Sequence, residues 1–408
     1  GTLRGGDGMK MSDLFRKEYE LECIAPLHIG SGEKLMAFEY LYDRKRHEVH
    51  FLDESKWIAF LEKHSLTDSF AVYVERRDFQ RKSLWEWLLG TGASEAELRS
   101  LALRKARAAT LTAERDRRNT LNDISCQTAL PDGTPYIPGS AIKGALRTGL
   151  LHGVIGKEPQ RFRGFWQEIA GARGALHEKQ RLWNRTMARL EQTALHTLEL
   201  PNTRAGDAVT SALRGLRVSD AVCVAGESET IVLQKVDLTT KMRQGEAGEN
   251  KISLFRECLP AGRRLRFSIT VDRSMLRTLG ISSLEEIVDM MRNFTREGLR
   301  LQERTFDREY RPLFEEAQEA DCLLGGGTGF LSKTLVHALA PSEEEARRFI
   351  AGYLDEKFTE WDRAARRKTP AHDHRLLDAR LSPRTLKMAR EDCDVWILGL
   401  CRMQEVQR

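Results

Sequence analysis

The 408-residue sequence lacks several features that would point to a well-known class of protein. No apolar run approaches the roughly 18 residues that a membrane-spanning helix needs, and no secretory hydrophobic segment is recognisable. The seven cysteines are scattered, odd in number and never arranged as C-x-x-C, which argues for reduced thiols and against a structural zinc site. We therefore expect a cytoplasmic protein without a bound metal.

The sequence also lacks a large excess of positive or of negative charge. The chain has 65 Lys and Arg residues against 60 Asp and Glu residues, which leaves a net charge of only +5. A nucleic-acid binder with this balance has to gather its basic side chains in one patch. The hydrophobic content of 41% and the charged content of 31% are typical of a folded globular chain rather than a disordered one.

The length predicts two domains. Residues 1–11 resemble a cloning remnant or a disordered start and are left out of the fold prediction. We predict an N-terminal domain over 12–205 with helical insertions, and a C-terminal domain over 206–408 that holds a glycine-rich loop. The boundary follows residues 201–206, beyond which strand-like alternation becomes frequent.

The stretch 135–150, PYIPGSAIKGALRTGL, is typical of an extended arm followed by a helix with Ser140 as its N-cap. The spacing i, i+4, i+8 predicts that one helical face is buried: Ile142, Leu146 and Leu150. Ser140, Lys143 and Arg147 share another stripe of the helix. A hydroxyl, two cations and free amides at one helix end would suit a phosphate, although a solvated basic face explains them equally well.

The stretch 323–334, LLGGGTGFLSKT, predicts a second loop, because three successive glycines disfavour a helix or strand interior. We expect these glycines to allow close backbone approach and to offer amides to an anion. Lys333-Thr334 suggests the phosphate loop G-x-x-x-x-G-K-[ST], but Ser332 stands where the second glycine is required. The dinucleotide pattern G-x-G-x-x-G fails at Phe330, so neither nucleotide motif is present.

Other candidate sites lack partners. His28, in the loop over 26–32, could act as a general base, but no orienting group is evident. His372 and His374 could chelate a metal, yet no third ligand is in view. The basic block over 160–200 interleaves cations with aromatics that could stack on bases, and burial of those aromatics in the core is the favoured interpretation.

Periodicity predicts the remaining elements. Helices are expected over 52–65, 79–89, 94–118, 160–200, 282–302 and 305–321. Strands are expected over 19–25, 121–130, 216–224, 230–238, 264–271 and 395–400.

Several of these segments together resemble one family. The segment 137–147, IPGSAIKGALR, is similar to the signature I-P-G-S-S-hydrophobic-K-G-hydrophobic-hydrophobic-R of the RAMP superfamily, the RNA-binding subunits of CRISPR effectors. Ala141 replaces a common serine. LHIGSG over 27–32 and Val218-Ser219-Asp220 also resemble RAMP chains.

Two more segments narrow the resemblance. The glycine loop and LSPRTLK over 381–387 are similar to segments of the fifth Csm subunit family of type III-A CRISPR effectors. The M-G-W arrangement often found after that second segment is absent, which leaves the docking of this end of the chain open.

The resemblance implies an α+β fold of two ferredoxin-like (RRM-like) RAMP domains with large helical insertions. It implies a non-catalytic subunit without cofactor that binds the CRISPR RNA, caps the filament at the RNA's 3′ end and supports its maturation in antiviral defence. Partners would be CRISPR RNA, other Csm subunits, above all the RAMP backbone subunit, and a cellular 3′ trimming nuclease. The RNA-binding residues expected are Ser140, Lys143, Arg147, Gly325, Gly326, Gly327, Thr328, Gly329, Lys333, His28, Ser31, Arg384 and Lys387.

Three alternatives remain open at the level of sequence. One is a RAMP endoribonuclease that acts through His28 or Asp123, and another is a sister RAMP subunit of a type III-B complex. The third is an ATPase that depends on Lys333.

Overall fold

The structure is a computed structural model that describes residues 13–108, 111, 121–240, 247–306, 308–391 and 393–407. The predicted α+β class is confirmed, because helices surround two large, mainly antiparallel sheets. The first sheet has the strand order β13-β18-β1-β12-β9-β7, with β8 also paired to β12. Its strands are β1 (Leu14–Cys23), β7 (Tyr136–Ile137), β8 (Leu216–Val218), β9 (Ala221–Cys223), β12 (Arg264–Asp272), β13 (Cys322–Leu323) and β18 (Leu400–Glu405).

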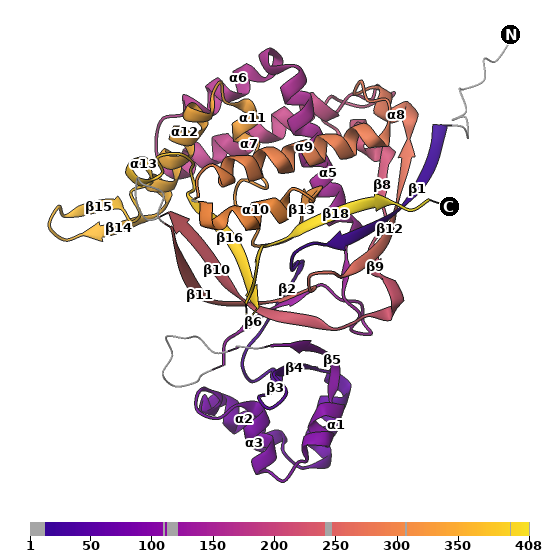
Figure 1. Cartoon of the computed structure of the whole chain (residues 1–408), viewed down its shortest axis with the longest axis vertical. Helices are drawn as coiled ribbons and strands as arrows, with labels where there is room; N and C mark the ends of the chain where they lie inside the picture. Colours follow the sequence, from indigo (N-terminus) through magenta and orange to yellow (C-terminus); the bar gives the residue numbers. More distant parts are fainter. Residues whose placement is uncertain are drawn as a thin grey trace.

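The first sheet contains a ferredoxin-like unit with the chain order β1-α5-β9-β12-α9-β18. Its neighbours, β18-β1-β12-β9, are all antiparallel. The helices α5 (Gly139–Lys157) and α9 (Leu284–Glu303) lie together over one face of this sheet (Figure 1). A Cβ on Gly149 would lie 2.3 Å from the Cα of Met291, so glycine is what lets the two helices approach so closely.

The second sheet has the order β2-β6-β11-β10-β5-β4-β3, and the hairpin β16-β17 joins it through β10. Its strands are β2 (Gly30–Leu35), β3 (Tyr40–Asp43), β4 (Glu48–Leu52), β5 (Ala102–Arg107), β6 (Ile124–Gln127), β10 (Thr230–Thr240), β11 (Ala247–Cys258), β16 (Thr385–Glu391) and β17 (Asp394–Ile397). The β1 strand leads through residues 24–29 into β2, so this short segment connects the two sheets.

Helical insertions cover both ends of the molecule (Figure 1). A small lobe holds β3 to β5 with α1 (Glu54–Lys63), α2 (Thr67–Glu75), α3 (Leu84–Gly90) and α4 (Glu95–Ser100), and it has its own apolar core. The other end holds α6 (Pro159–Ala170), α7 (Leu176–Leu195), α8 (Arg273–Arg277), α10 (Arg311–Ala317), α11 (Val336–Leu339), α12 (Glu343–Lys357) and α13 (His374–Leu377). The hairpin of β14 (Thr359–Asp362) and β15 (Arg367–Pro370) extends from α12.

Several element predictions were wrong in extent. The strand predicted over 216–224 is the pair β8 and β9, the helix predicted over 160–200 is the pair α6 and α7, and the helix predicted over 305–321 shortens to α10. The helix predicted over 94–118 ends at Ser100, and β5 follows it; residues 109–110 and 112–120 lie outside the described part. The single strand predicted over 395–400 is two strands, β17 and β18, joined by a turn at Gly399. The core interpretation of the basic block is confirmed for Phe162 and Trp166, which are only 1% and 5% exposed, whereas Phe165 and Trp183 pack on the core and remain partly exposed.

Strands from both sides of residue 205 share each large sheet, and the division of the chain into domains 12–205 and 206–408 remains a prediction. Among the described residues, no helix combines the length and apolar character that a membrane crossing requires. All seven cysteines are free thiols.

Candidate functional site

The α5 helix begins two residues earlier than the sequence predicts. Pro138 occupies the N-cap position, so the prediction that Ser140 caps the helix was wrong, and Ser140 lies exposed in the first turn. The first helical amide, at Gly139, instead donates to Asp220 Oδ1 at 2.7 Å. A Cβ at residue 139 would lie 2.3 Å from the carbonyl oxygen of Val218, so the chain can pass here only as glycine.

This contact changes the electrostatics of the helix end. A carboxylate at a helix N-terminus is stabilised by the helix dipole and already satisfies one free amide. Asp220 therefore competes with any anion for the start of α5, and the side chains beyond the first turn become the more favourable anion donors. As predicted, the opposite face of α5 is fully buried, since Ile142, Leu146 and Leu150 are 0% exposed.

The glycine-rich loop follows β13 and packs against the segment that connects the two sheets. Gly325 has a φ of +82°, and a Cβ there would lie 2.2 Å from the carbonyl oxygen of His28. The Gly326 amide donates to that same oxygen at 2.8 Å. The predicted close backbone approach is confirmed, and one of the amides expected to be available to an anion is already used.

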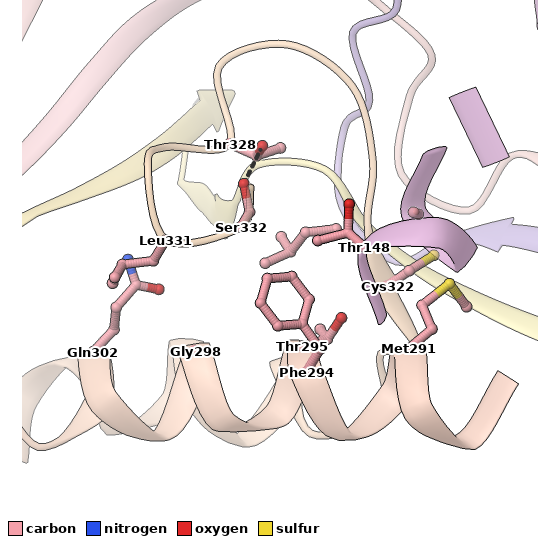
Figure 2. A pocket seen from close by; sticks show the side chains of 12 residues that line it. Thr148, Met291, Phe294, Thr295, Gly298, Gln302, Cys322, Thr328, Leu331 and Ser332 are labelled. Atoms are coloured by element: carbon pink, nitrogen blue, oxygen red, sulfur yellow. Dashed lines mark hydrogen bonds between the residues drawn. The ribbon is translucent and has the colours of Figure 1, made fainter. Parts of the chain in front are cut away.

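The turn that follows is held by its own hydroxyls (Figure 2). Thr328 Oγ1 and Ser332 Oγ are 2.8 Å apart, and Ser332 Oγ donates to the Gly329 carbonyl at 2.9 Å. Beneath this turn, α9 encloses a cavity of about 30 Å³ lined by apolar groups such as Phe294 and Leu331. A cavity of this size holds about two water molecules, so it is too small for a nucleotide.

Beside this cavity lies an open groove of about 400 Å³. Three segments that are far apart in the sequence form it: the start of β2, the exposed face of α5 and the glycine-rich loop. The lining residues are Ile29, Gly30, Ser140, Ala141, Gly144, Ala145, Arg147, Thr148, Leu323, Leu324, Gly325, Gly326, Ser332 and Lys333. The groove thus brings together five of the sequence-predicted residues: Ser140, Arg147, Gly325, Gly326 and Lys333.

Two cations line the groove. Lys333 is exposed and forms no side-chain hydrogen bond or ion pair with any residue that the structure describes. Arg147 is 47% exposed, and its Nη1 lies 3.2 Å from Glu191 Oε1 on α7. An exposed pair of this kind contributes at most about 1 kcal/mol, so an incoming phosphate could replace Glu191 at little cost.

Lys143 lies outside the groove. Its Nζ donates to the Leu213 carbonyl at 2.9 Å, which fastens α5 to the 3-10 turn Ala212–Gly215. Burial, assisted by the charge of Arg217, lowers the pKa of Lys143 below its ordinary value. The geometry favours a structural role for this ammonium group.

His28 lies beneath the groove and is only 5% exposed. Its Nδ1 is 2.6 Å from the Glu257 carbonyl oxygen, and because a carbonyl only accepts, Nδ1 carries the proton. Burial lowers the pKa of this imidazole, which favours the neutral form. Ser31 lies outside the groove lining on β2, where its Oγ accepts a hydrogen bond from the Glu33 amide at 3.2 Å.

Gly327, Thr328 and Gly329 belong to the glycine-rich loop but do not line the groove. Lys387 packs against the loop, because a Cβ on Gly329 would lie 3.3 Å from Lys387 Cγ. Gly327 packs on the guanidinium of Arg256, whose Nη1 would be 2.8 Å from a Cβ there. Lys387 Nζ donates to Asp237 Oδ2 at 2.8 Å, and Lys235 lies 3.4 Å from the same oxygen.

Cations crowd this region. Burial, followed by the charges of Lys387 and Arg256, lowers the pKa of Lys235. Crowded cations of this kind are typical of anion sites. Arg384, in contrast, is bound to the fully buried Asp378 and to the Thr240 carbonyl, and its side chain is 12% exposed.

A buried network that no sequence pattern predicts holds the connecting segment in place. Glu257 is 0% exposed and accepts two hydrogen bonds from Arg104, both at 2.8 Å. It also accepts from the Gln127 amide at 2.9 Å, while Gln127 Oε1 accepts from the Ile29 amide at 2.9 Å. This network fixes the residues that start β2, and its members lie too far apart in the sequence for any local pattern to reveal them.

The alternative catalytic and metal candidates are engaged elsewhere. Asp123 pairs with Lys34 at 2.9 Å, and His374 Nδ1 lies 2.9 Å from Asp378 Oδ2. Across the described residues, no three His, Cys, Asp or Glu side chains are grouped as a metal site requires.

Comparison with known proteins finds one superfamily and relatives that share one name. The model of the RAMP superfamily matches residues 20–332. Proteins named "CRISPR system Cms protein Csm5" from two strains of Mycobacterium tuberculosis, CDC 1551 and H37Rv, are 26% identical over 403 residues, which are 95% of this chain and 96% of theirs. The protein of the same name from Enterococcus italicus is 21% identical over 364 residues, 84% of this chain and 85% of the relative.

One solved structure is similar in fold. A chain in the "Cryo-EM structure of Csm-crRNA-target RNA ternary complex in type III-A CRISPR-Cas system" has a TM-score of 0.61 at 16% identity. The match covers 95% of this chain and 100% of that chain.

Proposed function

The chain belongs to the RAMP superfamily, and we propose that it is the fifth Csm subunit of a type III-A CRISPR effector that binds the CRISPR RNA without cleaving it. The groove is the surface that meets the RNA. The observation that carries the proposal is that three separate signature segments line this one groove, with Lys333 left without a partner among the described residues.

The groove suits the backbone of a single strand. Lys333 and Arg147 bind phosphates, while Ser140 and the backbone of Gly325 and Gly326 contact phosphate or ribose. Behind the loop, Arg256, Lys387 and Lys235 give a second group of cations, so the strand passes positive charge on both flanks of the glycines. The described residues that line the groove include no Asn, Gln, Asp or Glu side chain to read a base edge, which fits a guide whose sequence varies.

Placement in the complex follows from the resemblance. In this proposal the chain caps the filament at the 3′ end of the CRISPR RNA beside the RAMP backbone subunit, and a cellular nuclease trims the RNA that the cap leaves exposed. The subunit works in the cytoplasm. A sister subunit of a type III-B complex is the alternative assignment, and co-purification with the backbone subunit of one type or the other separates the two.

An endoribonuclease is the alternative activity. His28 is buried with Nδ1 committed to a carbonyl, so it is not poised as a general base. Asp123 forms an exposed pair with Lys34 and lies outside the groove lining. Cleavage of single-stranded RNA that disappears in Asp123→Ala or His28→Ala would establish this alternative. ATP turnover sensitive to Lys333→Ala would establish the ATPase.

The proposal is tested by a salt titration of single-stranded RNA binding. We expect Arg147→Ala/Lys333→Ala to weaken binding for every RNA sequence and to flatten the slope of log affinity against log salt by about 1.4 at most, because each phosphate contact on a single strand contributes about 0.7. The matched control is Lys45→Ala/Lys63→Ala, which removes the same charge from exposed positions of the small lobe. Equal slopes in the groove variant, the control and the wild type would contradict the proposal.

A further inference from the structure

A second hollow, of about 200 Å³, lies between α6, α7, α12 and α13, and no signature segment lines it. Figure 1 shows these helices together on the side of the molecule that carries the β14-β15 hairpin. We refer to it as the side hollow. Its lining residues are Ile169, Ala170, Ala172, Arg173, Lys179, Trp183, Arg348, Phe349, Gly352, Tyr353, Glu356 and Arg375.

The lining carries an excess of positive charge. Four cations face a single carboxylate, Glu356. Lys179 Nζ donates to both oxygens of Glu356 at 2.9 Å, and Arg375 Nη2 lies 3.8 Å from one of them. Arg173 is exposed and has no side-chain partner among the residues that the structure describes. The fourth cation, Arg348, pairs at 2.6 Å with Glu344, which lies outside the lining. Two cations therefore share Glu356 and a third is unpaired, which leaves donors for an incoming anion.

Aromatic rings form the other part of the lining. Trp183 meets Tyr353 edge-on at a ring separation of 5.0 Å, and it meets Phe349 at 5.1 Å. All three rings remain partly exposed. Gly352 adds a flat surface beside them, and a Cβ there would lie 3.0 Å from Arg375 Nη2. The hollow therefore combines ring surfaces, on which a base can stack, with guanidinium groups, which match a phosphate.

The side hollow is linked to the groove through one aromatic contact. Trp183 also meets Phe330 edge-on, with the ring centroids 6.5 Å apart. Phe330 belongs to the glycine-rich loop, three residues before Lys333 of the groove lining. This contact joins the lining of the side hollow to the loop that carries Lys333.

We propose that the side hollow binds one nucleotide, with its phosphate on Arg173 and Arg375 and its base against Tyr353. The nucleotide is either a unit of the RNA strand beyond the groove or a free mononucleotide. The strand form rests on the proposed function, because it requires RNA in the groove, while the free form does not.

The test uses the full chain with three probes: a short oligouridylate of about 4 nucleotides, a long one of about 16 nucleotides, and uridine monophosphate. The hollow variant is Arg173→Gln/Arg375→Gln, and Tyr353→Leu tests stacking separately. The matched control is Arg181→Gln/Arg185→Gln, which removes the same charge from exposed positions of α7 outside the lining. Thermal unfolding checks that every variant is folded.

We expect each hollow variant to lose about tenfold in affinity for a probe that occupies the hollow, while the control retains it. Loss for the long RNA alone assigns the site to the RNA strand, and loss for uridine monophosphate alone assigns it to a free nucleotide. The proposal is overturned when the hollow variants and the control bind all three probes equally, or when the wild type binds neither the long RNA nor the mononucleotide.

Two further outcomes separate the side hollow from the groove. If the groove variant Arg147→Ala/Lys333→Ala binds RNA normally while the hollow variant loses binding, the proposed function of the groove is rejected. The nucleotide site in the side hollow is then retained. Unchanged nucleotide binding with lost association to a neighbouring subunit would identify the hollow as an acidic-protein contact and overturn the proposal.

Discussion

At the scale of single residues, the cations of the signature segments have two different roles. Lys333 and Arg147 face the groove, whereas Lys143 and Arg384 hold parts of the fold together through a carbonyl and a buried carboxylate. The sequence pattern alone treats all of them as equivalent cations. Their partners come from distant segments, and only the folded chain distinguishes a paired cation from an available one.

Lys143 gives a prediction that separates these duties. We expect Lys143→Met to leave the salt dependence of RNA binding unchanged and to lower the free energy of unfolding by about 1 kcal/mol, because one hydrogen bond to the Leu213 carbonyl is lost. Urea unfolding and the RNA salt titration measure the two effects. A flatter slope of log affinity against log salt would contradict this prediction and indicate that Lys143 binds a phosphate.

Glu257 is fully buried, and we expect its carboxylate to stabilise the fold. We expect Glu257→Gln to lower the free energy of unfolding by about 3 kcal/mol or more, since it leaves the largely buried Arg104 without its carboxylate. Urea unfolding is the measurement, and Glu22→Gln, which removes an exposed partner of Arg402, is the control. A loss in Glu257→Gln no larger than the control's would contradict the buried-network account.

The buried histidines predict how stability depends on pH. Burial lowers the pKa of His28, His50 and His337 below the ordinary value of 6.5. Below about pH 6.5 the unfolded chain therefore binds more protons than the folded chain. The free energy of unfolding is thus retained above this pH and decreases as the pH falls below it. Each histidine contributes at most about 1.4 kcal/mol per pH unit.

We therefore expect urea midpoints to fall between about pH 7 and pH 5.5, before most carboxylates titrate. The fall should be smaller in His28→Asn, whose side-chain amide can still donate to the Glu257 carbonyl. Stability that stays level or rises as the pH decreases across this window would contradict the prediction.

At the scale of elements, the glycine-rich loop and α5 were predictable because their signals are local. Successive glycines and an i, i+4, i+8 apolar stripe reveal a loop and a one-sided helix within a few residues of sequence. The cap of α5 was not predictable, because Asp220 lies 81 residues away from Gly139. The strand β5 was mistaken for helix because its pairing with β4 and β10 overrides the helix propensity of its Ala, Leu, Arg and Lys residues.

The glycine-rich loop gives a prediction at this scale. We expect Gly325→Ala to destabilise the chain by more than about 2 kcal/mol and to weaken RNA binding, since the left-handed backbone and the 2.2 Å approach to the His28 oxygen both exclude a Cβ. Gly326→Ala is the matched control, because its Cβ would find the nearest atom at 3.4 Å. Equal losses of stability in thermal unfolding would contradict the packing account. RNA binding by Gly325→Ala is compared with the wild type alone, because Gly326 also lines the groove.

At the scale of the whole molecule, the ferredoxin-like unit combines strands from the beginning and the end of the described chain. Its first strand is β1 and its fourth is β18, while every other sheet and helical block is inserted between them. This arrangement puts the 27–32 loop, α5 and the glycine-rich loop around one groove. The α+β class and the segments of the groove could be predicted from the sequence, but their long-range pairing and the side hollow could not.

The central claim is that the groove holds the CRISPR RNA inside a Csm complex, and the most direct measurement is the length of the RNA in the purified complex. The complex is isolated through a tag on another subunit, with this chain either wild type or Arg147→Ala/Lys333→Ala, and its RNA is sized on a gel. We predict that the variant still assembles but that its RNA loses the uniform mature 3′ end found with the wild-type chain. A variant complex that carries RNA of the same amount and the same length would contradict the account.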